Sequence, residues 1–270
     1  MDFSDWIGNS VTKQDVITAR MVDHFRHTLG AHCYDGVAVP AGLHWCLSPD
    51  AVDPDELGPD GHPKLGGFLP NIPYPRRMWA GGWLEFHGDF NIGDTVQKLS
   101  RIDDIAFKSG NSGNLCFVAV THEFSVDGAL KLRERHDVVY RETVTAPPAL
   151  DPQPGTSAAH RWHVDSNEVM LFRYSALTFN GHRIHYDLPY STGVEGHGGL
   201  LVHGPLQATL MLNLAASAAG KMPSHMAYRG VRPLVCDKPI IIDATPADGI
   251  LETCVRGSDG NITMRGTVTI

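Results

Sequence analysis

Hydrophobic residues recur at helical spacing in one segment of each half of the chain. The first segment runs from Val11 to Leu29, where apolar side chains return every fourth residue from Ile17 onward. The second runs from about Pro205 to Ala219, with a proline suited to a first helical position and Gly220 suited to ending the helix. We therefore expect a helix over each segment.

Each expected helix is followed by strand-like patterns separated by turn sequences, over residues 82–142 and again over residues 225–270. The final nine residues, ITMRGTVTI, alternate apolar and polar side chains, as in a strand with one buried face. Between the halves, the Pro-rich stretch APPALDPQPGTS (146–157) is typical of a linker. The order helix-then-meander thus occurs twice. It predicts an α+β fold with an N-terminal unit (1–150) and a C-terminal unit (158–270) that share one sheet.

Two other segments carry no strong periodicity. Residues 49–78 are rich in Pro, Gly and Asp and predict a long loop. The stretch that begins at Leu171 predicts a short strand that leads into a polar loop.

Composition narrows the class of protein further. The net charge of −8 argues against nucleic acid as the main partner, because a phosphate binder needs a basic face. The five cysteines contain no CxxC pair, which predicts reduced thiols and a cytoplasmic protein. The opening residues, MDFSDWIGNS, lack the apolar core of a secretory signal, and no apolar run approaches the length that crosses a membrane.

The segment from Leu171 to Gln207 concentrates histidine, arginine and polar side chains. Its second half, GLLVHGPLQ, leads an apolar strand into the beginning of the second expected helix at Gly204. Polar groups beside a helix N-terminus can polarise a carbonyl, because the helix dipole and its free N–H groups favour negative charge there. This segment is therefore the candidate site.

Within that segment, the residues NGHRIHYD (180–187) and GLLVHG (199–204) resemble the hydratase-2 motif of the MaoC-like enoyl-thioester hydratases. His185 falls on the catalytic histidine of that motif. Gly204 falls on the glycine whose backbone N–H contacts the thioester carbonyl. The resemblance implies a double hotdog fold, in which each unit wraps an antiparallel sheet around one helix, with the catalytic motif only in the C-terminal unit.

The longer wording RYSALTFNGHRIHYD with GLLVHGPLQA is similar to a subgroup of double-hotdog proteins. That subgroup contains mitochondrial-type 3-hydroxyacyl-thioester dehydratases and the itaconyl-CoA and mesaconyl-C4-CoA hydratases. The resemblance implies an acyl-CoA substrate, no metal or redox cofactor, no membrane partner and a homo-oligomer. One departure matters: Asn180 stands where the broader family has its catalytic aspartate, and an amide cannot accept a proton as a base.

The chemistry of hydration suggests a role for each candidate residue. His185 is the expected base, because an imidazole titrates near working pH. Asn180 would orient the attacking water, and the Gly204 N–H would stabilise the charge that develops on the thioester oxygen.

Further residues are expected to contact the substrate or carry a second proton. Arg183 or Arg173 would bind a substrate carboxylate through two parallel hydrogen bonds. His203 is expected to contact the substrate, and either His203 or Glu195 is a candidate for the second proton carrier.

Several functions stay open at this point. The first is a hydro-lyase that converts itaconyl-CoA or mesaconyl-C4-CoA to citramalyl-CoA, and the second is a (3R)-hydroxyacyl-thioester dehydratase of fatty-acid metabolism. A hotdog thioesterase would need a carboxylate near the helix, for which Asp187 and Glu195 are candidates. An inactive acyl-CoA binding module is the fourth, because of Asn180. A metal site at His182, His185 and Asp187 is the weaker interpretation of that cluster, since HxxH alone specifies little.

Overall fold

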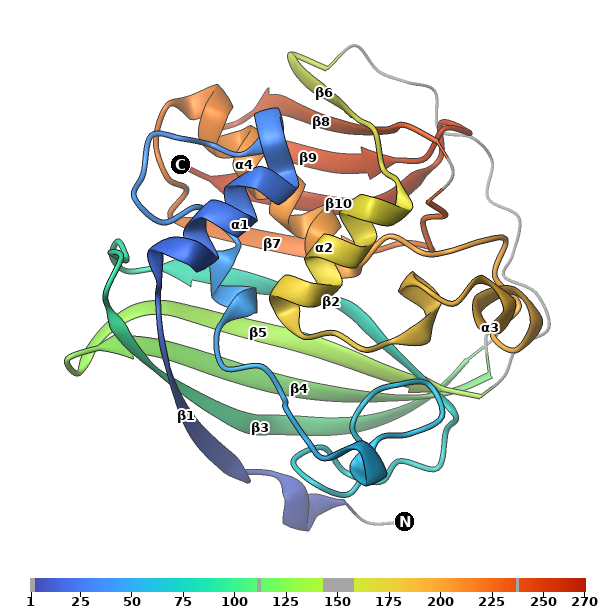
Figure 1. Cartoon of the computed structure of the whole chain (residues 1–270). Coiled ribbons are helices and arrows are strands. Elements are labelled where there is room, and N and C mark those ends of the chain that lie inside the picture. The colour runs from blue at the N-terminus through green and yellow to red at the C-terminus, as the bar shows by residue number, and fades with distance from the viewer. Residues whose placement is uncertain (1–2, 111–112, 143–157, 237) are drawn as a thin grey trace.

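The computed structural model describes residues 3–110, 113–142, 158–236 and 238–270. Its dominant element is one ten-stranded antiparallel sheet with the strand order β1-β3-β4-β5-β2-β7-β10-β9-β8-β6 (Figure 1). The strands are β1 (Ser10–Val16), β2 (Arg76–Phe86), β3 (Thr95–Gly110), β4 (Gly113–Val126), β5 (Ala129–Arg141), β6 (His160–Val164), β7 (His225–Gly230), β8 (Ile240–Ala247), β9 (Ile250–Arg256) and β10 (Ile262–Thr269).

The helices lie inside the curve of this sheet (Figure 1). The α-helices are α1 (Ala19–Leu29), α2 (Glu168–Thr178), α3 (Leu188–Gly193) and α4 (Gly204–Ala219). The short 3₁₀ turns are η1 (Ser4–Trp6), η2 (Gly30–His32), η3 (Leu43–Cys46), η4 (Pro54–Glu56) and η5 (Arg183–His185). No helix in the described part of the chain is long and apolar enough to cross a membrane.

The two halves of the sheet meet where β2 pairs with β7, from Gly81 opposite Arg229 to Glu85 opposite His225. The glycine Gly82 is required at this junction, because a Cβ atom there would lie 1.8 Å from the carbonyl oxygen of Arg135. The five strands on one side of the junction come from the first half of the chain and the five on the other side from the second half. The α+β class and the shared sheet are thus confirmed. The predicted linker 146–157 lies outside the described residues, and the unit boundaries stay a prediction.

Helix α4 lies against strands β6–β10 and is buried along most of its length. Its alanines permit this, because Ala208, Ala215 and Ala216 are fully covered and leave room for the strands around them. The helix ends at Gly220, whose φ of 68° is the left-handed conformation that glycine adopts without steric cost. The helix predicted from about Pro205 to Ala219 is therefore confirmed.

The helix predicted over Val11–Leu29 is wrong in its first part. Residues 10–16 form β1, whose side chains alternate in exposure, and β1 pairs with β3 at the sheet edge. Helix α1 begins only after Thr18, whose Oγ1 accepts a hydrogen bond from the Met21 N–H at 3.1 Å. The cap residue therefore marks the true start, whereas the apolar spacing extended the prediction too far.

The strand predicted from Leu171 is also wrong, since this stretch is helix α2. Asn167 caps it, because its Oδ1 accepts from the Met170 N–H at 3.0 Å. Leu171 and Tyr174 are buried while Phe172 is exposed, which is the three-residue spacing of a helix face. This correction changes which side chains of the segment reach the site.

Candidate active site

A large cavity lies between the two halves of the molecule and reaches the beginning of α4. Its volume of about 2410 Å³ exceeds the range of about 300–1,000 Å³ usual for drug-sized ligands, so it has room for a long one. It is lined by the loop of residues 50–69, by β2 and by the loop that carries the motif. His185, Asn180 and Gly204 are all in its wall, so the structure brings these three candidates together.

His185 is held in one protonation form by the extended segment that precedes α4. Its Nδ1 lies 2.8 Å from the carbonyl oxygen of Leu201, which can only accept, so Nδ1 carries the proton and Nε2 has a free lone pair. The Leu201 N–H in turn donates to the carbonyl of Ile184 at 3.0 Å, which fixes the motif loop to this segment. Burial lowers the pKa of His185 to about 3, and the Leu201 hydrogen bond offsets only part of this effect. The ring is therefore a neutral hydrogen-bond acceptor at pH 7.

Gly204 begins α4 and faces Trp79 across the cavity wall. A Cβ atom on Gly204 would lie 2.5 Å from Cε3 of Trp79, so only glycine fits here. The first turn also contains a proline, and the extended segment before it is hydrogen-bonded to residues 234–236 through Val202 and Leu200. The N-terminus of a 16-residue helix is thereby aimed into the cavity, where its dipole favours developing negative charge.

His203 lies behind His185 and is not among the described residues that line the cavity. The two rings stack with their centroids 3.6 Å apart, and His203 Nε2 lies 2.8 Å from the Ser175 Oγ. Burial lowers the pKa of His203 well below its usual value, and the charge of a protonated His185 would lower it further. The geometry gives His203 the task of supporting the His185 ring, not the predicted contact with substrate.

Asn180 follows the left-handed residue Phe179 at the end of α2. Its Oδ1 accepts from the His182 N–H at 2.9 Å, so the carbonyl shapes the loop and the amide N–H₂ remains available to a ligand. The position lines the cavity, as predicted, although half of the side chain is committed to the turn.

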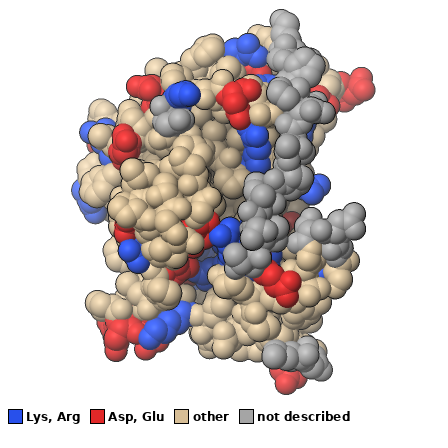
Figure 2. All heavy atoms as spheres, turned by 90° about the vertical axis from the view of Figure 1, so that its right-hand side faces the viewer, with Lys and Arg blue, Asp and Glu red and all other residues tan. Residues whose placement is uncertain are grey.

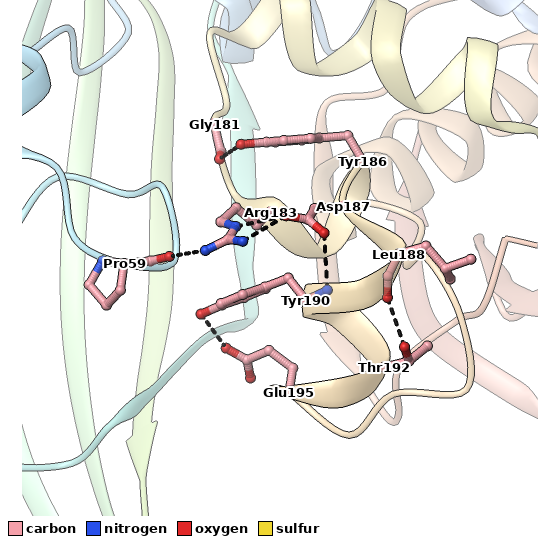
Figure 3. Close-up of polar contacts among 9 residues, drawn as sticks. All are labelled: Pro59, Gly181, Arg183, Tyr186, Asp187, Leu188, Tyr190, Thr192 and Glu195. Carbon is pink, nitrogen blue, oxygen red and sulfur yellow. Dashed lines mark hydrogen bonds and ion pairs between the residues drawn. The ribbon is translucent and has the colours of Figure 1, made fainter.

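Arg183 points away from the cavity and ties three segments together (Figure 3). Its guanidinium donates to Asp187 Oδ2 at 2.7 and 3.0 Å and to the Pro59 carbonyl at 3.0 Å, and it lies over the Tyr190 ring at 4.0 Å. Asp187 also caps α3, because its Oδ1 accepts from the Tyr190 N–H at 3.0 Å. The donors of Arg183 are thus engaged within the protein, and the side chain does not lie in the cavity wall, where a substrate carboxylate was expected to contact it.

Arg173 is also remote from the cavity. It is exposed on α2, and its Nη1 donates to the His27 carbonyl of α1 at 3.4 Å. The structure places Arg173 there because the segment is a helix and not the expected strand, so that Ser175 and Ala176 line the cavity and residue 173 faces α1. Glu195 lies at the cavity wall, where its Oε1 accepts from the Tyr190 OH at 3.4 Å and its backbone carbonyl from Arg76 at 2.7 Å.

Several cavity residues of the N-terminal half had no expected role. Asp60 and His62 come from the loop of residues 49–78, and Lys98 and His136 come from β3 and β5. A carboxylate two residues before a histidine in a Gly- and Pro-rich loop is a weak signal in a sequence, because only the fold brings the loop to the motif.

A cluster of arginines borders the cavity on the face that carries α3 and the ends of β2 and β5. Arg76 and Arg141 are paired neighbours on these strands, and Arg77 follows. Figure 2 shows Lys and Arg side chains gathered along the middle of this face. Among the described residues, nothing accepts a hydrogen bond from the buried Nε of Arg141, and both burial and the charge of Arg76 lower the pKa of Arg141. These strand ends therefore offer positive charge to an anionic ligand.

Comparisons with known proteins agree with this geometry. The family model of hydroxyacyl-thioester dehydratase type 2 matches residues 42–236. The chain is 37% identical over 276 residues to mesaconyl-C(4)-CoA hydratase of Chloroflexus aurantiacus, with 100% of this chain and 98% of the relative covered.

Solved structures share the fold at low identity. A MaoC-like dehydratase superposes with a TM-score of 0.73 at 14% identity, covering 97% of each chain. A Mycobacterium tuberculosis protein described as a double hotdog fold superposes at 0.55 and 13% identity, covering 97% of this chain and 95% of that one. The double hotdog prediction is thus confirmed, and the chain belongs to the hydroxyacyl-thioester dehydratase type 2 family.

Proposed function

We propose that this protein is a hydro-lyase that adds water reversibly to the double bond of a short, carboxylated enoyl-CoA, converting mesaconyl-C4-CoA or itaconyl-CoA to citramalyl-CoA. One observation carries the proposal: the free Nε2 of neutral His185 and the N-terminus of α4 at Gly204 line the same cavity. Hydration needs both an acceptor for the hydrogen of water and a positive end for the thioester oxygen. The hydratase activity of the 37% identical relative supports the same reaction.

Each of the residues at this site would have a separate role in the addition of water. The Gly204 N–H and the α4 dipole would stabilise the oxygen that gains enolate charge, at about 3 kcal/mol for a well-placed donor. His185 Nε2 would accept a hydrogen bond from water, and the free amide of Asn180 would hold the water oxygen. Water addition has no net redox change, so this site would work without a redox cofactor.

The arginine cluster supports a CoA thioester as the substrate. CoA carries phosphates, and Arg77 and Arg141 present guanidinium groups, which bind phosphate oxygens in pairs. Arg76 beside them is already paired with Glu195 and adds positive charge nearby. They lie at the strand ends near α3, so CoA would lie along this face with its acyl group directed inward. The overall charge of −8 does not oppose this, because binding depends on the local field.

Lys98 is our candidate for the carboxylate of the acyl group. It lines the cavity wall formed by β3, and among the described residues no carboxylate lies within ion-pair distance of its ammonium. Burial lowers the pKa of Lys98, and the opposite charge of Glu134 offsets part of this. The hydrogen bonds that Glu134 accepts from Trp45 Nε1, at 2.6 Å, and from His136 are both on its Oε1. Glu134 acts on Lys98 only from beyond ion-pair distance, so a substrate carboxylate would become the close partner of Lys98.

The experiment compares kcat/KM for mesaconyl-C4-CoA and crotonyl-CoA in the wild type and in Lys98→Met. We expect the variant to lose on the order of 10²-fold on the carboxylated substrate, the usual scale for losing a charged hydrogen bond of about 1.5–3 kcal/mol, and little on crotonyl-CoA. Lys108→Met, an exposed lysine of the same strand, is the matched control. Equal losses on both substrates would remove Lys98 from substrate selection.

A second function is favoured by the family description and by the cavity volume. The same site run in reverse is a (3R)-hydroxyacyl-thioester dehydratase, and a cavity of about 2410 Å³ has room for a longer acyl chain. A higher kcat/KM for a long, unbranched trans-2-enoyl-CoA than for mesaconyl-C4-CoA would favour this function. Assembly into a homo-oligomer and a cytoplasmic location remain proposals from the sequence.

A further inference from the structure

The loop that contains Asp60, Gly61 and His62 is fixed directly against the catalytic motif. The Arg183 N–H donates to the Asp60 carbonyl at 2.9 Å, and the Arg183 side chain donates to the neighbouring Pro59 carbonyl (Figure 3). Gly61 lies against Gly181 so closely that a Cβ atom on Gly61 would be 2.0 Å from the Gly181 carbonyl oxygen. Two segments about 120 residues apart in the sequence are thus held in contact. Pro59 and Arg183, which share a hydrogen bond, are separated by 124 positions.

Within this loop, Asp60 and His62 form a carboxylate–imidazole pair. Asp60 Oδ2 lies 3.0 Å from His62 Nδ1, and Asp60 Oδ1 accepts from the His62 backbone N–H at 3.0 Å. Burial alone would raise the pKa of Asp60, but the hydrogen bonds and charge of His62 hold it below its usual range. An ionised carboxylate can only accept, so His62 Nδ1 carries a proton and Nε2 is left as an acceptor.

The His62 ring continues into the motif through a row of imidazoles. Its centroid lies 4.1 Å from that of His182, which lies 5.6 Å from that of His185. All three side chains and Asp60 line the cavity. Burial, and then the charge of His62, lower the pKa of His182 to about 3. Asp60 thus brings a carboxylate to this row of imidazoles, whereas Asn180 has an amide and cannot act as a base.

We propose that Asp60 and His62 supply the acid–base function that Asn180 cannot, with His62 as the proton carrier and Asp60 as its positioning residue. This rests on the proposed hydration reaction. As the oxygen of water bonds to C3, its proton passes to His62 Nε2, and the C2–C3 π electrons move onto the thioester oxygen beside Gly204. The thioester carbonyl then re-forms as C2 takes that proton from His62, so that one H and one OH are added overall.

The pair has the geometry of the carboxylate–histidine unit of hydrolases, in which the carboxylate orients the imidazole, and the Asp60 side chain is 30% exposed. The neutral rings of His182 and His185 are poor bases by comparison, because burial opposes their protonation. His185 therefore acts as the acceptor that holds the water, and Arg183 acts as the clamp that holds the Asp60 loop in reach.

The same three side chains, Asp60, His62 and His182, have ligand atoms close enough to hold a metal ion, all within 4.8 Å of one another. The experiment must therefore separate proton transfer from metal binding. Metal content of the purified wild type and its activity after dialysis against EDTA are measured first. Activity that survives EDTA with no bound metal agrees with the proposal. Stoichiometric metal, with activity lost on its removal, overturns it.

The decisive variant is Asp60→Asn, which keeps the shape of the side chain and removes its charge. We expect kcat to fall by on the order of 10²–10⁴-fold with KM nearly unchanged, and the kcat–pH profile to change with it. Asp53→Asn is the matched control, since Asp53 is exposed in the same loop and outside the cavity. His62→Ala should lose as much and recover in part when imidazole is added.

The outcomes separate the two proposals. A wild type inactive on every enoyl-CoA refutes the proposed function itself. An active wild type with an Asp60→Asn variant of unchanged kcat and pH profile overturns the role of the pair and leaves hydration in place. A His62→Ala variant that imidazole fails to rescue, while its melting temperature falls, would reduce the pair to a structural contact and also overturn the proposal.

Discussion

The close contact between Gly204 and Trp79 predicts what a single added methyl group would do to stability and activity. In Gly204→Ala the new methyl would lie 2.5 Å from Cε3 and 3.1 Å from Cζ3 of Trp79. Carbon atoms pack at about 3.5–4.0 Å, so the ring must retreat by about 1 Å. The rings of Trp45, His136 and Tyr228 surround Trp79 with centroids at 5.9, 5.6 and 4.8 Å. The indole can therefore retreat only toward the cavity that it lines.

The cost follows from this geometry. Overpacking of this kind costs about 1–3 kcal/mol. A protein of this size loses roughly 2–4 °C of melting temperature per kcal/mol, so we expect a fall of several degrees. A shift of about 1 Å beside the thioester site is expected to lower kcat on the order of 10²-fold. Differential scanning calorimetry and steady-state kinetics on one enoyl-CoA measure both effects.

The other end of the same helix provides the control. Gly220 has a φ of 68° and no heavy atom within 4 Å of the added methyl, so Gly220→Ala should cost about 1–2 kcal/mol of backbone strain alone. Its melting temperature should fall while its kcat is kept. If Gly204→Ala instead showed the kcat and melting temperature of the wild type, the close contact at the start of α4 and the role drawn from it would be refuted.

Three further predictions concern the histidines and the clamp. His185→Gln should lower kcat on the order of 10²-fold, because the ring nitrogen that holds the attacking water in place is lost; turnover near that of the wild type would remove His185 from the reaction. Arg183→Ala should lower kcat by the same factor on carboxylated and plain enoyl-CoA, since it holds a loop; a loss confined to carboxylated substrates would return it to substrate binding. The pKa values of His182 and His185 are lowered to about 3, so the unfolded chain gains one proton at each ring below about pH 6.5 that the folded chain does not. The free energy of unfolding should then fall by roughly 2–3 kcal/mol per pH unit from pH 6.5 toward 3, as measured by urea titration. A flat stability between pH 7 and pH 5.5 would contradict these lowered pKa values.

The parts of the fold that the sequence predicted are those set by local patterns. Helix α4 has a proline in its first turn, a face of small apolar residues and a glycine at its end, and all of these signals lie within one continuous stretch of sequence. The errors arose where two neighbouring elements shared one pattern. The regular spacing of Ile17 and the following apolar residues obscured the change from β1 to α1. In α2, apolar and polar residues alternate irregularly, so the helix that begins after its cap at Asn167 was not recognised.

The site was predictable only as far as its motif is continuous. His185, Asn180 and Gly204 all line the cavity, because the end of α2, the turn η5 and the beginning of α4 follow one another closely in sequence. The partners of Arg183 and Arg173 lie 124 and 146 residues away, at Pro59 and His27, so their true contacts depend on the tertiary fold.

The central claim is that the cavity at the start of α4 adds water to an enoyl-CoA. Mass spectrometry of mesaconyl-C4-CoA, itaconyl-CoA, crotonyl-CoA and a long trans-2-enoyl-CoA, each incubated with the wild type and with His185→Gln, tests it most directly. We predict that the wild type increases the mass of the carboxylated thioesters by one water, with the variant nearly inactive. Release of free CoA without water gain, or no change in any thioester, would contradict the account.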